Sequence, residues 1–208
     1  MNDEFSGATP SERAYWRELV DRYETWRQRW LSTVGTTRGD AAEWSDSRLW
    51  FRDGYPYPDW RGLALERSGN GYLVLTVWTE RRTSPGIAIK SMYSRLEDAG
   101  KYVIADIGDS LRKECGLEPL FQQWQRAGVR DGIAKSSDVD ENIVRFIADR
   151  NGVSHDVIRR FTHKYSVKSE PSVYAYSATS SEPMVNVMLL SYDELDTLLC
   201  EGLPCIVD

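Results

Sequence analysis

The chain has 208 residues, and its apolar fraction of 41% is enough for the hydrophobic core of one domain with a modest extension. This composition excludes global disorder, and no apolar run approaches the roughly 20 residues of a membrane helix. The formal net charge of −6 argues against general nucleic-acid binding. The first residues lack the basic and apolar regions of a signal peptide, so we expect a cytoplasmic protein without membrane contact.

A long amphipathic helix is expected near the N-terminus. Residues 9–12, Thr-Pro-Ser-Glu, combine an N-cap hydroxyl, a proline at the first helical position and a glutamate three residues after the cap. Large apolar side chains then recur at helical spacing, and they are Trp16, Leu19, Tyr23, Trp26 and Trp30. This stripe is either part of the core or a partner-binding face, because tryptophan is common at binding hot spots.

A β-meander follows the helix and its linker. Alternating apolar residues predict strands at residues 48–52, 62–67, 72–79 and 86–92. Asn70-Gly71 predicts a tight hairpin turn, because both residues tolerate positive φ. Residues 79–85 predict a second hairpin loop. Residues 55–58, Tyr-Pro-Tyr-Pro, cannot continue a central strand, since proline donates no ladder hydrogen bond.

Helices dominate the second half of the sequence. Ser94 and Glu97 form a candidate capping box for a helix that continues past Leu111, in which Gly100 and Gly108 lower the helix propensity. A capped helix is expected from residues 138–141 to Gly152, and another after Ser154. Residues 172–178 and 183–190 predict two more strands, and a short helix is expected from 191 to about 199.

These elements predict an α+β fold. The expected architecture is an antiparallel β-sheet, built as a meander and packed by helices on one side, with an N-terminal amphipathic helix. We divide the chain into residues 1–46, a tryptophan-rich helix and linker, and residues 47–208, a single α+β domain with an acidic C-terminal segment. Seven acids and no lysine or arginine follow Lys168. This segment is a solvated acidic tail or a surface that docks onto a basic partner.

No pattern in the sequence indicates catalysis. The sequence contains neither a glycine-rich phosphate loop nor a nucleophile elbow. His155 and His163 lie eight residues apart on one predicted helix, about 12 Å along its axis, which is too far to share a metal ion. The three cysteines fit no metal or redox spacing, and we interpret them as buried apolar side chains. We therefore expect a non-enzymatic protein without a metal or cofactor.

A second pattern resembles the helix-turn-helix of the Lac-repressor type. Ala148 allows close helix packing, Gly152 lies at the turn and Ser154 caps the second helix. Four basic residues could contact phosphates, namely Arg159, Arg160, Lys164 and Lys168. Any two capped helices joined by a short turn produce the same pattern. Because the sequence pI is about 5.1, we do not expect nucleic acid to be the partner.

The centre of the chain carries a family resemblance. Its residues are the 71–76 strand, the 80–82 loop with Gly86, and the 90–92 segment, followed by Leu96, Glu97, Lys101, Tyr102, Gly108, Leu111, Arg112, Glu118 and Pro119. Together with a weaker match at residues 153–158, they resemble a polymorphic-toxin immunity family over about residues 48–164. That family includes the immunity factor for the tuberculosis necrotizing toxin, a secreted NAD glycohydrolase. The resemblance implies a cytosolic antitoxin that binds a cognate toxin domain and occludes its active cleft.

The hairpin tip is the first candidate for toxin binding. It is polar and is held by two strands, and its residues are Glu80, Arg81, Arg82, Thr83, Ser84, Pro85 and Gly86. The two arginines could pair with carboxylates, and Gly86 would allow close backbone approach. An ordinary solvated hairpin remains the alternative. Four further aromatic residues are candidates for the interface or for covering the sheet, namely Trp50, Tyr55, Tyr57 and Trp60.

Three hypotheses follow from the sequence. The preferred one is a stoichiometric immunity protein that binds a toxin domain as a monomer in a 1:1 complex, the toxin being an NAD glycohydrolase if the resemblance extends that far. The second is a helix-turn-helix regulator that uses residues 140–168. The third is an enzyme of unrecognised type, for which the sequence singles out no residue.

Overall fold

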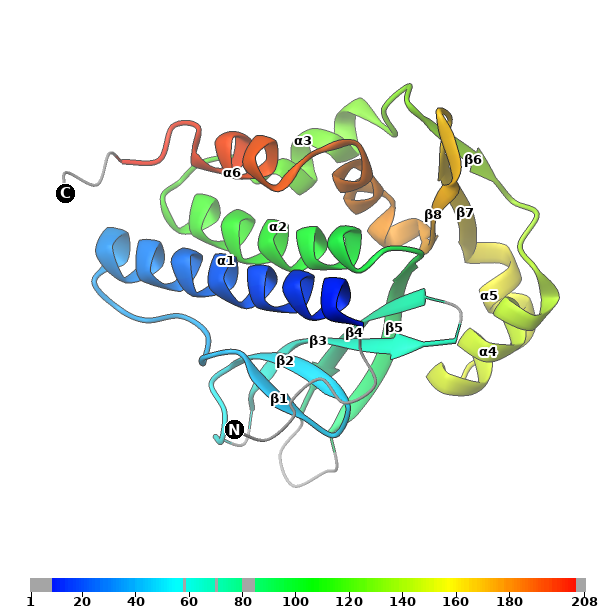
Figure 1. The fold of residues 1–208 in the computed structure, drawn as a ribbon, viewed down its shortest axis with the longest axis horizontal. Helices are drawn as coiled ribbons and strands as arrows, with labels where there is room; N and C mark the ends of the chain where they lie inside the picture. Colours follow the sequence, from blue (N-terminus) through cyan, green and yellow to red (C-terminus); the bar gives the residue numbers. More distant parts are fainter. Residues whose placement is uncertain (1–8, 58, 70, 80–84, 205–208) are drawn as a thin grey trace.

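One antiparallel sheet organises the protein (Figure 1). The computed structural model describes residues 9–57, 59–69, 71–79 and 85–204. Within these residues, eight strands pair in the order β1-β2-β3-β4-β5-β8-β7-β6. The first five strands form a continuous meander, and a long N-terminal helix precedes them. The predicted α+β class is therefore confirmed.

The elements follow one another along the chain with short connections. The strands are β1 (Glu43–Ser45), β2 (Arg48–Asp53), β3 (Arg61–Ser68), β4 (Gly71–Trp78), β5 (Gly86–Tyr93), β6 (Ile133–Ser136), β7 (Thr162–Val167) and β8 (Glu170–Ala178). The helices are α1 (Pro10–Val34), α2 (Leu96–Glu114), α3 (Leu120–Ala127), α4 (Glu141–Asn151), α5 (His155–Phe161), the 3-10 helix η1 (Thr179–Leu189) and α6 (Tyr192–Cys200). In the described part of the chain, no helix has both the length and the apolar character that spanning a bilayer demands.

Helix α1 begins as its sequence predicts. The Thr9 hydroxyl accepts a hydrogen bond from the Glu12 backbone N–H at 3.2 Å, and Pro10 occupies the first turn. The five side chains of the predicted stripe are all buried. They belong to the large core cluster, in which α1 contacts α2. The tryptophan stripe is therefore core and not a partner-binding face.

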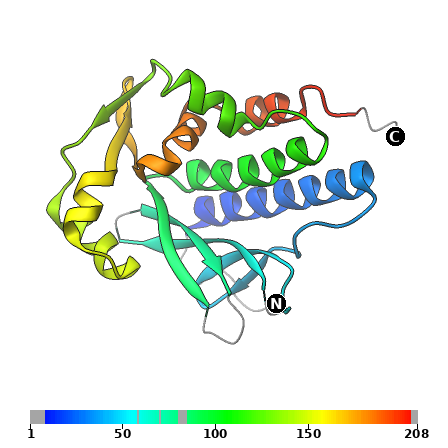
Figure 2. The same cartoon turned by 180° about the vertical axis from the view of Figure 1, so that it is seen from behind.

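Helix α2 is the central helix of this layer and lies between α1 and α6 in both views (Figures 1 and 2). A Cβ atom on Gly100 would lie 2.2 Å from the Tyr192 hydroxyl, and one on Gly108 would lie 2.6 Å from a methyl of Leu199. Both glycines therefore allow α6 to pack closely on α2, which offsets the helix propensity that they lack.

The start of α2 differs from the prediction. Its N-cap residue is Arg95, whose side chain makes no capping hydrogen bond. Ser94 is still bound to strand β8, because its backbone N–H donates to the Tyr174 carbonyl at 2.8 Å and its hydroxyl accepts from the Tyr174 N–H at 2.9 Å. The predicted capping box at Ser94 and Glu97 is wrong, because the serine hydroxyl is hydrogen-bonded to strand β8 and does not cap the helix.

Helices cover both faces of the sheet, but unequally. Helices α1, α2, α3, η1 and α6 contribute to the large core cluster on one face. Helices α4 and α5 contribute Ile143, Val144, Ile147 and Ile158 to a smaller cluster on the other face, where they meet strand residues such as Leu75. The predicted one-sided packing thus describes the larger layer, and the α4–α5 pair adds a partial second layer.

Two predictions for the C-terminal half are wrong. Residues 183–190 are not a strand, because residues 179–189 form η1, in which the buried Asn186 side chain accepts from the Arg130 N–H at 2.9 Å. A short apolar run does not distinguish these two structures by periodicity. His163 does not share a helix with His155, because α5 ends at Phe161 and His163 lies in β7.

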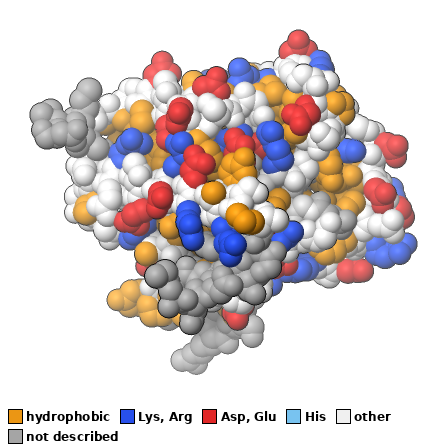
Figure 3. Space-filling model, in the orientation of Figure 1, with side chains coloured by type: hydrophobic (Ala, Val, Ile, Leu, Met, Phe, Trp, Pro, Cys, Tyr) orange, Lys and Arg blue, Asp and Glu red, His pale blue; other side chains and the backbone are white. Residues whose placement is uncertain are grey.

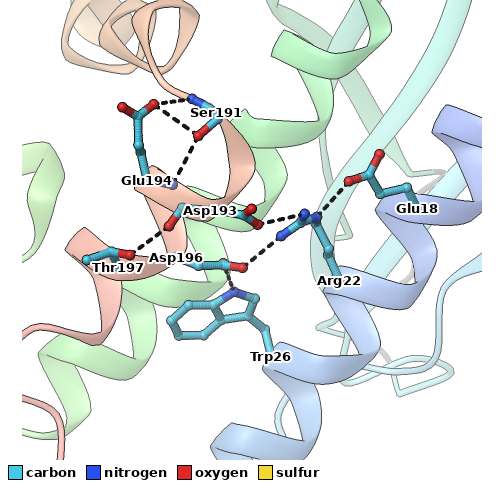
Figure 4. A network of polar contacts seen from close by, with 8 residues as sticks. All are labelled: Glu18, Arg22, Trp26, Ser191, Asp193, Glu194, Asp196 and Thr197. Atoms are coloured by element: carbon cyan, nitrogen blue, oxygen red, sulfur yellow. Dashed lines mark hydrogen bonds and ion pairs between the residues drawn. The ribbon is translucent and has the colours of Figure 1, made fainter.

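The acidic C-terminal segment docks onto α1 through an ionic network (Figure 4). The Arg22 guanidinium donates to Glu18, Asp193 and Asp196, each at 3.0 Å. The Trp26 indole N–H donates to Asp196 at 2.8 Å. Acidic and basic side chains are interspersed over this face of the molecule (Figure 3). Part of the acidic segment therefore has an internal structural role.

Asp109 of α2 caps the start of α3, and its titration gives a test of the fold. Its carboxylate accepts from the Leu120 N–H at 2.6 Å and from the Phe121 N–H at 2.8 Å. Burial nevertheless raises the pKa of Asp109 to about 6 from an ordinary value of 3.8. Because the folded state then holds the proton more tightly than the unfolded state, this group lowers stability as the pH rises from about 4 to about 6.

We predict that Asp109→Asn removes this pH dependence. A shift of about two pKa units corresponds to about 3 kcal/mol, at 1.36 kcal/mol per unit. The free energy of unfolding of the variant, relative to the wild type, should rise by roughly 2–3 kcal/mol between pH 4 and pH 7. Urea unfolding followed by tryptophan fluorescence at both pH values measures it, and an unchanged difference would contradict the assignment.

Candidate functional site

The four predicted interface aromatics lie at one end of the sheet, where β2 ends and β3 begins. Trp50 and Trp60 are buried, whereas the side chains of Tyr55 and Tyr57 are 46% and 74% exposed. Residues 54–57, between the two strands, form a turn and do not continue β2, which agrees with the prediction that the prolines interrupt the strand. We call residues 54–57 the aromatic turn.

The Arg52 guanidinium organises these aromatic rings. It lies 4.3 Å from the ring centroid of Tyr55, 4.9 Å from that of Trp50 and 5.7 Å from that of Trp60. It also donates to the Glu43 carboxylate at 3.0 Å. A guanidinium suits this position, because its planar cation stacks on aromatic faces while its N–H groups bind a carboxylate.

Asp40, in the linker after α1, holds the backbone at the start of the aromatic turn by two hydrogen bonds. Its carboxylate accepts from the Tyr55 N–H at 3.2 Å, and its own N–H donates to the Arg52 carbonyl at 2.7 Å. Within the turn, the Tyr57 N–H donates to the Gly54 carbonyl at 2.9 Å, and Gly54 has a φ of 85°. The two exposed tyrosines are therefore held on a preorganised backbone.

A pocket of about 820 Å³ borders this turn. It lies between the C-terminal half of α2 and the ends of strands β2 to β5, and we call it the wedge pocket. Phe51, Leu63 and Thr76, which are neighbours across three strands, line it on the sheet side. Its helical side consists of residues on α2, which are Val103, Asp106, Ile107, Ser110, Lys113 and Glu114.

The helical wall of the wedge pocket contains polar groups that face the sheet. Asp106, Ser110 and Lys113 lie on the side of α2 where a helix packed on a sheet normally has apolar side chains. Asp106 is exposed to solvent through the pocket. Protein atoms around its carboxyl partly desolvate the charged form, which raises its pKa against the opposing charges of Lys90, Arg38 and Arg61.

One row of cross-strand neighbours forms the mouth of the wedge pocket. Asp53, Arg61, Trp78 and Gly86 pair across β2, β3, β4 and β5. A Cβ atom on Gly86 would lie 2.4 Å from the Trp78 indole, so the indole fills the space above this glycine. The close approach that Gly86 permits is therefore made by Trp78, which is still 40% exposed.

The wedge pocket has more positive than negative charge available. Arg38 forms an ion pair with Asp53 at 3.3 Å and lies 4.9 Å from the Trp30 ring. Within the described part of the chain, Arg61 and Lys113 form no ion pair, and both are exposed. The Lys90 ammonium lies 5.8 Å from the Tyr102 ring.

Of the predicted toxin-binding hairpin, residues 80–84 lie outside the described residues, so only Pro85 and Gly86 can be placed. They lie at the start of β5, beside Trp78 and at the same end of the sheet as the aromatic turn. The sequence-based selection omitted Trp78, Arg61 and Lys113. For Trp78 the sequence did contain a signal, because a tryptophan stands at the end of a predicted strand next to a polar loop.

The helix-turn-helix look-alike has the predicted local geometry. Gly152 adopts a φ of 64°, and the Ser154 hydroxyl accepts from the Val157 N–H at 3.4 Å. Its basic residues, however, are dispersed: Lys164 lies in β7, and Lys168 pairs with Asp131 at 2.7 Å.

The surface of α5, the second helix of this motif, has ion pairs and exposed apolar side chains that do not suit phosphate binding. Arg159 pairs with both Glu141 and Asp156, at 2.9 Å and 2.7 Å. The exposed side of α5 also includes the apolar residues Val157 and Phe161. This surface therefore lacks an array of available cations along one helix.

The described residues contain no group of three or more His, Cys, Asp and Glu side chains that could hold a metal ion. Cys115 and Cys200 are half-buried free thiols, and Cys205 lies outside the described residues. No family model matches the chain, and neither a curated protein nor a solved structure matches it significantly.

We predict that Arg52 stabilises the aromatic turn. Arg52→Met should lower the free energy of unfolding by about 2 kcal/mol, because it removes a largely buried cation from three rings. It should also speed amide hydrogen exchange at Tyr55 and Tyr57. Arg126→Met is the matched control, because Arg126 is exposed and its ion pair, among the described residues, is with Glu118, so its loss should change stability much less than the loss of Arg52. Equal exchange rates in both variants would contradict this role.

Proposed function

We propose that this chain is an immunity protein that acts by binding and not by catalysis. It binds a cognate toxin domain in a 1:1 complex and blocks the active site of that toxin. The resemblance in the sequence supports this proposal. Through the same resemblance, we propose that the toxin is an NAD glycohydrolase. Many of the residues that carry the resemblance lie in β4, β5 and α2, and two of them, Thr76 and Lys90, line the wedge pocket.

The observation that carries the proposal is the exposure of Tyr55 and Tyr57 on a turn with a fixed backbone. Tyrosine is enriched at binding hot spots because it offers a large amphipathic contact area with few rotatable bonds. A turn that is already ordered loses little further entropy when a partner binds. Arg52 and Asp40 supply this order, so the aromatic turn suits a protein partner.

The positions of the two connecting segments support a single docking face. β2 ends and β3 begins in the same cross-strand row in which β4 ends and β5 begins. The aromatic turn and the predicted toxin-binding loop therefore start from adjacent points on one end of the sheet. A toxin domain bound there would contact the aromatic turn and cover the mouth of the wedge pocket.

The proposal is tested by producing this chain together with the toxin domain encoded beside its gene. We expect cell survival and a 1:1 complex on size exclusion. Tyr57→Ala should weaken the complex by about tenfold to a hundredfold, as truncation of an aromatic hot spot does.

Tyr15→Ala is the matched control for this experiment. Tyr15 is exposed too, at 46% against 74% for Tyr57, but it lies on α1, away from the aromatic turn. Its truncation should leave the affinity within about twofold of the wild type. The docking face is refuted if Tyr15→Ala weakens the complex and Tyr57→Ala does not. Failure of the wild type both to rescue cells and to form a complex refutes the immunity function.

A further inference from the structure

The wedge pocket has a chemical character that the exposed tyrosines do not explain. Polar groups on the sheet-facing side of a helix lower the stability of the fold if they are buried without partners, but they can bind a ligand if they line a pocket. The pocket is also continuous with the aromatic turn, because Asp53 and Arg61, which flank that turn, both line it. Whatever contacts the turn can therefore extend into the pocket.

The charges of the pocket select the sign of its occupant. With Arg38 paired to Asp53 and Arg52 paired to Glu43, the described cations that remain in the lining are Arg61, Lys90 and Lys113. Two acids remain, Asp106 and Glu114. Arg61, Lys113 and both acids are exposed, and Asp106 has Lys90, Arg38 and Arg61 as its neighbouring charges. Because cations outnumber acids in the lining and already surround Asp106, the pocket favours an acidic occupant.

Resting on the proposed function, we propose that the wedge pocket receives a projecting acidic segment of the toxin domain. Arg61 and Lys113 bind its carboxylates at the mouth, and Phe51 and Leu63 pack against its apolar atoms on the sheet side. The immunity protein thus captures a part of the toxin in a concave site, in addition to presenting its own loop. Cations at the rim of an interface mainly raise the association rate and its dependence on salt.

The proposal is tested by charge reversal at the mouth. Lys113→Glu and Arg61→Glu should each weaken binding of the toxin domain at least tenfold at low ionic strength, chiefly through a slower association rate. The effect should shrink at high salt because ions screen exposed charges. Lys113→Arg should bind as the wild type does. Arg145→Glu is the matched control, with the same change in net charge on α4 at the opposite face, and should bind within about twofold of the wild type.

The outcomes separate the two proposals. If the wild type forms no complex with the toxin domain, the immunity function and this inference both fail. If the wild type binds and both reversed variants bind equally well, only the acidic-segment inference fails. Tighter binding by either reversed variant would also overturn it, because the partner would then present a basic group to the pocket. Circular dichroism and thermal unfolding of each variant confirm that these exposed residues can be changed without loss of the fold.

Discussion

Packing around helix α2 is the constraint on which the rest of the structure depends. Its first half is buried on all sides, and Lys101 and Asp98, both almost inaccessible to solvent, form an ion pair at 2.8 Å. The Lys101 ammonium also donates to the Leu190 carbonyl at 2.6 Å, which ties α2 to the segment before α6. Asp98 also pairs with Arg95 at 2.8 Å, and Lys101 with Glu97 at 3.5 Å. Removal of Asp98 or Lys101 would leave a buried charge with only a more exposed partner, so this pair helps to fix the position of the helix.

The second half of α2 has a different role. With the first half held by the core, its later turns lie over the ends of β2 to β5, and their sheet-facing side includes Asp106, Ser110 and Lys113. One helix therefore anchors the core and also forms the wall of a polar pocket. The pocket and the aromatic turn are neighbours because Asp53 and Arg61, which flank the turn, lie in the row at the end of the sheet.

Local signals in the sequence were sufficient for much of the fold. The Thr9 cap, the tryptophan stripe of α1, the meander and the Gly152 helix end all depend on neighbouring residues, and all are present. The wrong predictions concern segments whose structure depends on pairing with residues that are distant in the sequence. Helix α5 ends at Phe161 because residues 162–167 pair with β8, and Ser94 is bound by β8 and does not cap α2. No local pattern reports such pairing.

The candidate site was predictable only in part, for the same reason. The four aromatics around the β2–β3 connection could be named from their residue types and from the prolines beside them. The two tryptophans are buried because they pack in the second core cluster, whereas the exposed Tyr55 is held at the turn by Arg52 and Asp40. Arg61, Trp78 and Lys113 come together only through strand register and the placement of α2. A sequence without its fold gives no sign of that arrangement.

Amide hydrogen exchange of this chain, alone and with the toxin domain encoded beside its gene, tests the central claim most directly. If the toxin domain docks at this end of the sheet, amide exchange should slow at residues 52–57 and in the C-terminal half of α2, with little change in α4 and α5. Protection gathered instead on α4 and α5, or no added protection at any segment, would contradict docking at this end of the sheet.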